Sequence, residues 1–482
     1  MKDATWLKDP DLFRQAALIG GAWVSGGATL DVTDPATGEV MGIVPEITAD
    51  QTRQAIAAAE AAFAAWRKRP HAERAAALER WHDLMLVHAD DLALILTREQ
   101  GKPVAEAKGE IAYGASFVKW FAEEARRIEG SVIPAPADDR RILALKEPVG
   151  VCAIITPWNF PNAMITRKVA PALAAGCTVV IKPSDLTPFS ALALGVLAER
   201  AGIPAGVINI VTGLPTAIGA ALTESPTIRK LSFTGSTRVG ALLMEQCAPT
   251  IKRLSLELGG NAPFIVFDDA DLDAAIEGVI ASKFRNGGQT CVCSNRILVQ
   301  DGIHDAFVEN LASRVSAMKV GPGTDAGVEI GPMINAAAIQ KITRHINDAV
   351  SHGATIAAQA RVPRGQYAAP TLLTGAMPFM LLATEETFGP VAPIFRFQTE
   401  NEAVALANDT PFGLASYFYT RDMARAWRVG EALEFGMVGL NVGNVSTTVS
   451  PFGGIKQSGL GREGARDGIE EYLETKAFHM GL

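Results

Sequence analysis

Histidine and cysteine are scarce in this chain, which has 7 His and 5 Cys among 482 residues. No two histidines have the His-x-x-x-His spacing, and Cys291 and Cys293 have no second ligand pair, so no metal site is expected. An odd number of cysteines in a long chain is typical of free thiols in a reducing compartment. We therefore expect a cytoplasmic protein without a metal ion.

Positive charge is also in deficit, because 44 Lys and Arg stand against 52 Asp and Glu, a net charge of −8. This balance argues against nucleic acid as a partner. Residues 148–166 and 201–223 carry no charge, but prolines and glycines interrupt both stretches, so neither predicts a membrane span. Residues 1–14 carry mixed charges without an apolar run, which predicts no signal peptide.

Two common motifs are missing as well. No Gly-x-Ser-x-Gly occurs, which argues against a serine hydrolase. The letters of the Gly-x-Gly-x-x-Gly dinucleotide fingerprint occur at 459–464, but no strand of a βαβ unit is expected before them.

The rest of the composition is that of a large globular protein. With 48% hydrophobic residues over 482 positions, the length predicts about three structural units. A capping-box pattern from Thr48 to Gln51 opens an alanine-rich helix that should end near Pro70. A second helical stretch is expected over 72–100, ending at Gly101 and Pro103.

From residue 149 onward, short apolar runs alternate with helical segments. The expected strands are 151–155, 178–181, 207–211, 230–233 and 254–258, and the expected helices are 163–175, 190–201, 216–222 and 238–247. This alternation predicts a parallel sheet covered on both faces, with ligands bound beyond the carboxyl ends of its strands. A second αβ region follows over 257–450, and the tail 469–482 should pair with another element or another subunit.

Three residues are candidates for covalent chemistry. Cys291 follows a Gly-Gly turn, which can present its sulfur to a cleft, although a single such cysteine could equally be buried in a loop. Glu257 ends an apolar strand, where burial would raise its pKa toward the range of a general base. Asn159 ends another strand and offers a neutral amide donor suited to an oxyanion.

These residues lie in five motifs that resemble the NAD(P)-dependent aldehyde dehydrogenase superfamily. The motifs are PWNFP at 157–161, FTGST at 233–237, LELGG at 256–260, GQTC at 288–291 and ETFGP at 386–390. They stand in the order of the family, and the likeness extends from residues 34–38 to residues 459–463. Further segments, at 163–168, 283–286, 291–295 and 451–456, are most similar to succinate-semialdehyde dehydrogenases.

The resemblance implies an α/β fold of three parts. A Rossmann-like parallel-sheet cofactor domain would comprise residues 1–125 and 148–256, and an α/β catalytic domain residues 257–450. A small β oligomerisation flap would comprise 126–147 and 465–482. A homodimer or homotetramer is expected.

The resemblance also implies catalytic roles. Cys291 would attack the aldehyde as a thiolate, forming a thiohemiacetal and then a thioester. The Asn159 amide and the Cys291 N–H would hold the oxyanion, and Glu257 would activate the hydrolytic water. Cys293 would be either a redox switch that closes a disulfide or a second packing cysteine.

Twelve residues are implied in binding the cofactor: Ile155, Thr156, Pro157, Trp158, Lys182, Ser184, Asp185, Gly213, Gly235, Ser236, Glu386 and Phe388. The carboxylate of Asp185 would repel a 2′-phosphate and favours NAD, whereas neighbouring Ser184 could tolerate the phosphate. Use of either NAD or NADP therefore remains open.

For the substrate, the resemblance implies Arg167, Arg285 and Ser446 around the distal carboxylate of a semialdehyde, with succinate or glutarate semialdehyde expected. Taken alone, Arg167 could be a helix-surface charge. A broad-specificity aldehyde dehydrogenase is the alternative. The presence of Glu257 disfavours transfer to coenzyme A, and the presence of all three catalytic candidates disfavours a non-catalytic binding protein.

Overall fold

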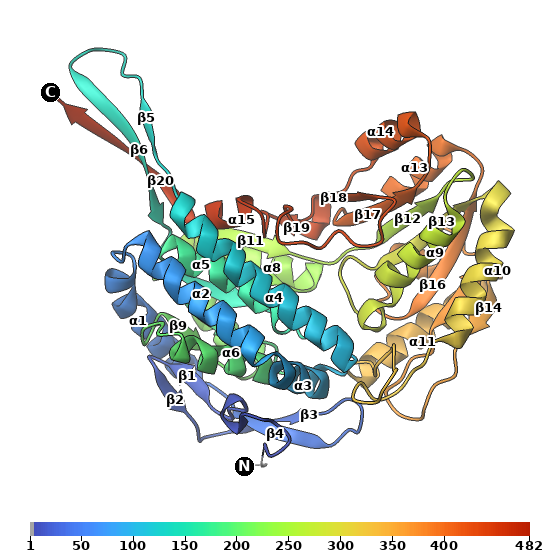
Figure 1. The fold of residues 1–482 in the computed structure, drawn as a ribbon, viewed down its shortest axis with the longest axis horizontal. Coiled ribbons are helices and arrows are strands. Elements are labelled where there is room, and N and C mark those ends of the chain that lie inside the picture. The colour runs from blue at the N-terminus through green and yellow to red at the C-terminus, as the bar shows by residue number, and fades with distance from the viewer. Residues whose placement is uncertain (1–3) are drawn as a thin grey trace.

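The computed structural model describes residues 4–482, and it consists of two sheet-centred lobes and a projecting flap (Figure 1). Residues 1–3, which belong to the segment expected to carry no signal peptide, lie outside the described part. The first lobe is built from residues before position 258, together with the short segment that contains β19. The second lobe follows it in the chain.

The sheet of the first lobe has eight strands in the order β19-β11-β10-β7-β8-β9-β1-β2. Their bounds are β1 Ala17–Ile19, β2 Ala22–Val24, β7 Val151–Ile155, β8 Thr178–Lys182, β9 Ile208–Ile210, β10 Ile228–Thr234, β11 Arg253–Glu257 and β19 Gly459–Leu460. The five strands from β7 to β11 are parallel, as the alternating pattern predicted, and their order reverses between β7 and β10. This is the order of a doubly wound nucleotide-binding sheet.

Helices cover both faces of this sheet, which confirms that prediction. They are α1 Ala49–Trp66, α5 Ala163–Ala175, α6 Phe189–Arg200, α7 Pro215–Glu224 and α8 Thr237–Cys247. Along β7, Cys152 and Ile154 join the core under α5 and α6, whereas Val151 and Ala153 join the core under α1, α7 and α8. Because the strands are buried on both faces, they are apolar throughout rather than alternating.

The N-terminal helices follow the predictions only in part. The capping box of α1 forms, since Gln51 N donates to Thr48 Oγ1 and Thr48 N donates to Gln51 Oε1. The single stretch expected over 72–100 is wrong: the chain breaks at His88 into α2 His71–Val87 and α3 Ala89–Gln100. No glycine or proline marks this break. It lets α2 pack on α5 while α3 packs on α6, and α4 Val104–Glu124 then crosses α5.

The second lobe holds a seven-stranded sheet in the order β14-β15-β16-β13-β12-β17-β18. The bounds are β12 Ala262–Val266, β13 Ser294–Gln300, β14 Thr355–Gln359, β15 Thr371–Thr374, β16 Val391–Phe397, β17 Ala415–Tyr419 and β18 Met437–Leu440. All neighbouring strands except β14 and β15 are parallel. Its helices are α9 Leu272–Val279, α10 Asp301–Ala317, α11 Ala336–Ser351, α12 Leu381–Thr384, α13 Glu400–Asn408 and α14 Met423–Ala432.

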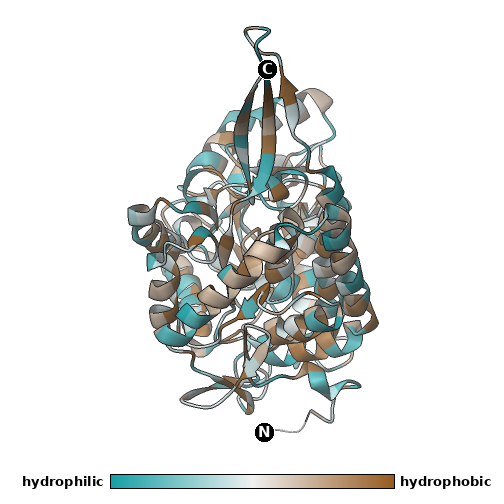
Figure 2. Ribbon diagram, turned by 90° about the vertical axis from the view of Figure 1, so that its left-hand side faces the viewer, coloured by the Kyte–Doolittle hydropathy of each residue, from teal (hydrophilic) through white to brown (hydrophobic). Residues whose placement is uncertain are grey.

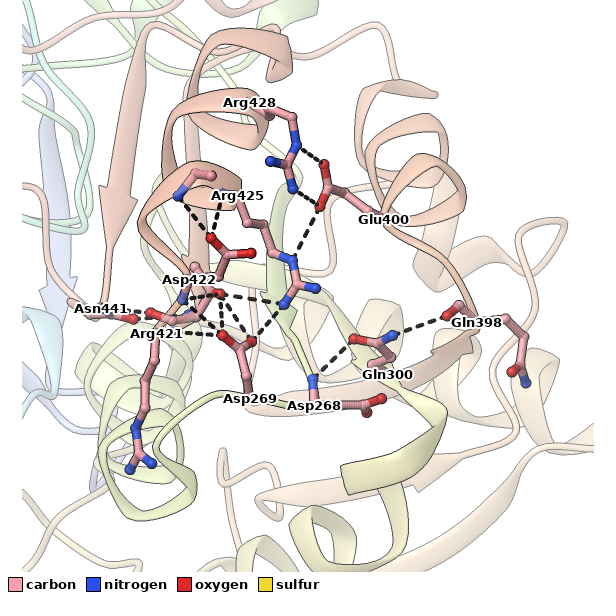
Figure 3. Close-up of polar contacts among 12 residues, drawn as sticks. Asp268, Asp269, Gln300, Gln398, Glu400, Arg421, Asp422, Arg425, Arg428 and Asn441 are labelled. Carbon is pink, nitrogen blue, oxygen red and sulfur yellow. Dashed lines mark hydrogen bonds and ion pairs between the residues drawn. The ribbon is translucent and has the colours of Figure 1, made fainter.

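A network of charged side chains joins the strand ends of this second sheet (Figure 3). Asp269, just after β12, accepts hydrogen bonds from Thr420 Oγ1, the backbone N–H groups of Arg421 and Asp422, and the guanidinium of Arg425. Arg425 also bonds to Glu400 on α13 (3.1 Å). Asp269 and Glu400 both have cationic partners, and these contacts fasten α13 and α14 to the sheet.

The flap is a separate three-stranded sheet in the order β20-β6-β5, formed by β5 Ser131–Ile133, β6 Arg140–Pro148 and β20 Leu473–Gly481. The tail pairs antiparallel with β6, from Leu473 opposite Pro148 to Gly481 opposite Arg140, so it does join another element. Figure 2 shows the flap standing out from the body, with hydrophobic and hydrophilic segments along its strands. The exposed hydrophobic residues on these strands are Val132, Ile133, Leu145, Phe478 and Met480.

The remaining elements are short. β3 Thr29–Thr33 and β4 Val40–Pro45 form a two-stranded sheet, and α15 Asp467–Glu470 precedes β20. Ile469 and Tyr472, within and after α15, pack into the core of the first lobe. The domain boundaries expected from the sequence stay predictions. Within residues 4–482, no helix combines the length and apolar character needed to cross a membrane.

Candidate active site

The two lobes meet at a cavity of about 370 Å³. The loops after β7 and β10 form one wall, at the point where the order of the first sheet reverses. Cys291, the start of α11 and the loop 386–388 form the opposite wall. Ligands of doubly wound sheets bind at such switch points, so the topology alone marks this cavity.

Six of the twelve predicted cofactor residues line the cavity: Pro157, Trp158, Gly235, Ser236, Glu386 and Phe388. The other six do not line it but lie at or just after the ends of β7, β8 and β9 along the same sheet edge: Ile155, Thr156, Lys182, Ser184, Asp185 and Gly213. Thr156 N donates to the carbonyl of Lys182 (3.1 Å), whose ammonium lies 3.7 Å from Asp185 Oδ1. The structure thus brings the predicted set together as two adjoining groups.

Two aromatic side chains that line this cavity, Trp158 and Phe388, contact each other. The rings of Trp158 and Phe388 meet edge to face, with centroids 5.6 Å apart. Phe388 has a φ of 56°, a left-handed conformation that a bulky residue adopts only when the surrounding structure holds it. Beside it, Glu386 accepts a hydrogen bond from Gly260 N (3.1 Å), and burial raises the pKa of this carboxyl to about 7.

The start of α8 borders the same cavity. Ser236 caps this helix by accepting a hydrogen bond from Val239 N (3.4 Å). The unpaired N–H groups and the positive dipole end of the helix therefore lie beside the cavity, where they suit a phosphate. A helix N-terminus and an aromatic pair together fit a nicotinamide dinucleotide.

Cys291 lies at the junction of this cavity with a second, narrow one. Residues 286–288 before it all have positive φ, namely Asn286 at 52°, Gly287 at 61° and Gly288 at 74°. A side chain on Gly288 would overlap the carbonyl of Gly389, so only glycine lets the loop pack there. The expectation that a Gly-Gly turn presents this cysteine to a cleft is confirmed by the geometry.

Burial raises the pKa of the Cys291 thiol to about 12, although the positive charges of Arg167 and Arg285 act in the opposite direction. The negative charges of Glu257 and Glu386 add to the increase. The thiol is therefore protonated at neutral pH, and a base must remove its proton before the sulfur can act as a nucleophile.

Asn159 lines the cavity beside Cys291, and several buried groups hold it in place. Its side-chain amide donates to the carbonyl of Gln289 (2.9 Å). The backbone carbonyl of Asn159 accepts hydrogen bonds from Lys102 Nζ (2.8 Å) and from Asn286 Nδ2 (3.0 Å). Lys102 and Asn286 were not predicted to support Asn159, because only the tertiary fold brings the segment before α4 and the cysteine loop to this residue.

Lys102 needs a counter-charge because it is fully buried. Glu110 on α4 provides it, accepting from Lys102 Nζ at 2.6 Å. The other oxygen of Glu110 accepts from the backbone N–H groups of Asn162 and Ala163 at the start of α5. The pair therefore fixes the loop that carries Asn159 relative to α4 and α5.

Glu257 is the last residue of β11 and is 3% exposed. Neither carboxylate oxygen has a hydrogen-bond partner within residues 4–482. Burial, followed by the negative charge of Glu463, raises its pKa to about 8. The increase agrees with the expectation from its place at a strand end, and its role as a base stays a prediction.

The narrow cavity on the far side of Cys291 contains all three predicted substrate residues, Arg167, Arg285 and Ser446. Its other lining residues are Tyr113, Phe160, Met164, Thr290, Val292 and Phe452. Arg285 and Ser446 also line a neighbouring cavity of about 280 Å³ that extends toward α4. Phe160 and Phe452 lie in motifs noted from the sequence without an expected substrate role, whereas no sequence pattern had indicated Tyr113.

Arg167 is 1% exposed, so the reading of this residue as a helix-surface charge is wrong. Its guanidinium lies over the ring of Phe452, 4.2 Å from the centroid, and forms an ion pair with Glu463. Glu463 also binds the buried Lys168. Despite burial, the charges of Arg167 and Lys168 hold the pKa of Glu463 below its usual value.

The side chain of Cys293 lies against Lys283 and not in the cavities that Cys291 lines. Its sulfur is fully buried, 3.2 Å from Lys283 Nζ, and donates to the Lys283 carbonyl. It lines neither cavity that contains Cys291. A disulfide between the two cysteines would require Cys293 to leave Lys283. Across the part of the chain that the structure describes, no three His, Cys, Asp or Glu side chains form a group that could hold a metal ion.

A doubly wound sheet whose switch-point cavity is lined by a helix N-terminus and an aromatic pair is typical of nucleotide-dependent oxidoreductases. The sequence profile of the aldehyde dehydrogenase family matches residues 23–478, and the chain belongs to this family.

Similar proteins cover nearly the whole chain. A glutarate-semialdehyde dehydrogenase of Pseudomonas putida is 59% identical over 472 residues, covering 98% of each chain. Succinate-semialdehyde dehydrogenase [NADP(+)] of Escherichia coli is 58% identical over 480 residues, covering 99% of this chain and 100% of its own. The crystal structure of an aldehyde dehydrogenase from Brucella melitensis superimposes with a TM-score of 0.98 at 60% identity, covering 98% of this chain and 99% of its own.

Proposed function

We propose that this enzyme oxidises succinate semialdehyde, or a close ω-carboxy aldehyde such as glutarate semialdehyde, to the dicarboxylic acid. The observation that carries the proposal is the pair of guanidinium groups, Arg167 and Arg285, in the narrow cavity next to Cys291. Two cations in a largely apolar cavity favour a substrate with a negative charge at the end opposite its aldehyde. The names of the semialdehyde relatives agree with this choice of substrate.

Cys291 is the nucleophile in this proposal. Because its pKa is about 12, the proton has to leave the sulfur as attack begins. Of the two carboxylates whose charges act on the thiol, Glu257 and Glu386, Glu257 is the one without a hydrogen-bond partner within residues 4–482, and it would take this proton. The sulfur adds to the aldehyde carbon to form a thiohemiacetal. The Asn159 amide and the Cys291 N–H hold the oxyanion, and one such donor contributes about 3–4 kcal/mol to the transition state.

A bound NAD(P)+ would supply the oxidising power of the reaction as the acceptor of the hydride. Trp158, Glu386 and Phe388 would hold its nicotinamide end, and Gly235 and Ser236 its pyrophosphate. Lys182, Ser184 and Asp185 would bind the adenosine ribose, with Ile155, Thr156, Pro157 and Gly213 forming the adjoining edge. We favour NAD because the carboxylate of Asp185, close to Lys182 just after β8, would repel a 2′-phosphate.

Glu257 completes the reaction by activating water against the thioester on Cys291. Its raised pKa, about 8, suits a base that must both accept and release a proton near neutral pH. Hydrolysis frees the dicarboxylic acid and restores the thiol.

The exposed hydrophobic residues of the flap support assembly into a homodimer or homotetramer. We also infer a cytoplasmic location from the five free cysteines.

The test of the substrate compares succinate semialdehyde with butanal, which has the same four-carbon chain without the carboxylate. With saturating NAD and then NADP, we expect kcat/KM to favour the semialdehyde by about 100-fold or more, since two charge-assisted contacts are at stake. Equal kcat/KM values for the two aldehydes would contradict the proposed substrate and favour the alternative, a broad-specificity aldehyde dehydrogenase. A higher rate with NADP than with NAD would contradict the proposal that Asp185 makes the enzyme prefer NAD.

A further inference from the structure

Tyr113 lies on α4, one turn after Glu110, and lines both the narrow cavity and the neighbouring larger one. Its ring packs edge to face on Phe117, with centroids 4.8 Å apart, which limits its movement. The hydroxyl group is the polar end of a side chain whose ring is otherwise held by apolar contact. Its position relative to α4 is therefore preset before any substrate binds.

The Tyr113 hydroxyl is buried and makes no regular hydrogen bond within residues 4–482. Its polar neighbour is the guanidinium of Arg167, whose contact with the hydroxyl acts to lower the pKa of the phenol. Arginine can only donate hydrogen bonds, so the O–H of Tyr113 has no acceptor among the described residues, although buried tyrosine hydroxyls normally have one. Arg167 Nη1, in the same narrow cavity, likewise has no hydrogen-bond partner within residues 4–482. One O–H and one N–H donor without acceptors thus belong to residues of one small cavity, beside Arg285 and Ser446.

The charges around Tyr113 define what this hydroxyl can bind. Burial raises the pKa of the phenol, and the charges of Arg167 and Arg285 offset this only in part. The group is therefore a neutral donor at physiological pH, in a cavity whose cations attract a carboxylate. Part of the Arg167 guanidinium is already engaged by Glu463, so this arginine alone cannot satisfy both oxygens of an incoming carboxylate.

We propose that the Tyr113 hydroxyl donates a hydrogen bond to the distal carboxylate of the substrate and so helps to select ω-carboxy aldehydes. This inference rests on the proposed function and adds a specificity-determining residue to it. A carboxylate has about four acceptor positions, and the guanidinium groups together with Ser446 and Tyr113 surround it from α4, α5 and the second lobe. Tyr113 would then be the one neutral donor from α4 in the set.

The test is Tyr113→Phe, which removes the hydroxyl and keeps the ring that packs on Phe117. The matched control is Tyr367→Phe, because the hydroxyl of Tyr367 is also buried and unpartnered but lines none of these cavities. Steady-state kinetics of the full-length enzyme would be measured with succinate semialdehyde and with butanal.

We expect Tyr113→Phe to lower kcat/KM for succinate semialdehyde by about 10- to 100-fold, the range for a hydrogen bond to a charged group. The value for butanal should stay within about twofold, which also shows that the variant is folded, and Tyr367→Phe should change neither. An equal loss with both aldehydes would overturn the inference, because Tyr113 would then only shape the cavity.

Two further outcomes separate this inference from the proposed function. If the wild-type enzyme prefers succinate semialdehyde and Tyr113→Phe keeps the whole preference, the role of Tyr113 is wrong and the arginine pair stands. If the wild-type enzyme does not distinguish the two aldehydes, the proposed function fails, and the inference fails with it.

Discussion

The two lobes each carry a cluster of charged residues at the strand ends of their sheet, and the clusters differ in how their charges are paired. Arg425 in the second lobe lies 4.5 Å from the centroid of Phe267 and binds Asp269 and Glu400 at half-buried positions. Arg167 in the first lobe likewise lies over an aromatic ring and binds a carboxylate, but it is fully buried and one of its nitrogens is unpaired.

The carboxylates differ in the same way. Hydrogen bonds from Thr420 and from two backbone N–H groups lower the pKa of Asp269, although its partial burial alone would raise it. Neither oxygen of Glu257 has a hydrogen-bond donor among the described residues, and burial raises its pKa to about 8. A paired cluster stabilises the fold, whereas a buried and incompletely paired cluster keeps groups available for a ligand.

The largest effect should come from the covalent residues. Cys291→Ala should lower turnover by at least about 1000-fold, because no other group can form the thioester. Glu257→Gln should lower steady-state turnover by about 100- to 10,000-fold while leaving the first hydride transfer measurable. Mass spectrometry should then detect the acyl group on Cys291.

Cys247→Ala is the control for the cysteine, since that residue is buried in the core away from the cavity. Full steady-state turnover by Glu257→Gln would rule out its assignment as the base.

Alanine variants of Arg167, Arg285 and Arg425 should distinguish arginines that bind substrate from one that only stabilises the fold. Arg167→Ala should raise KM for succinate semialdehyde by about 100-fold and leave KM for butanal nearly unchanged. Arg285→Ala should do the same without leaving a buried carboxylate unpaired, because no ion pair of Arg285 occurs within residues 4–482. Arg425→Ala should leave both KM values unchanged and lower the free energy of unfolding by about 1–2 kcal/mol in urea denaturation.

A similar KM change in all three variants would contradict the distinction between the two clusters. It would mean that the charge clusters of both lobes act on substrate binding only through the stability of the fold.

The pH dependence should reflect the raised pKa of Glu257. Below about pH 8 this carboxyl is mostly protonated and cannot accept a proton from water, so kcat should rise about tenfold per pH unit as the pH approaches 8 and then level off. The profile of kcat from pH 5 to 9 measures this directly. Glu257→Gln should flatten it, and an unchanged profile in that variant would assign the ionisation to another group.

The smallest effect concerns Cys293, whose thiol is held by Lys283 away from the cavity. If it acts as a redox switch, peroxide should inactivate the enzyme, dithiothreitol should restore activity, and Cys293→Ser should abolish the recovery. A wild-type enzyme that does not recover with dithiothreitol would make Cys293 a packing residue.

Much of the first lobe could be predicted from the sequence. The parallel strands β7 to β11 and the helices between them follow from apolar runs of about five residues alternating with helical segments. The break at His88 could not be predicted, because no glycine or proline marks it and tertiary packing decides it. The support of Asn159 by Lys102 depends on residues 57 positions apart, a contact that no local pattern contains.

Local sequence patterns were enough to indicate the available chemistry: a cysteine after a Gly-Gly turn, a glutamate at a strand end and arginines within family motifs. The burial of Arg167 against Glu463 and the contact of Cys293 with Lys283 follow instead from how distant segments pack. Only the tertiary structure could also place Tyr113 between the cavities. The physical reason is that pKa values and unpaired donors depend on burial and on distances between segments far apart in the chain.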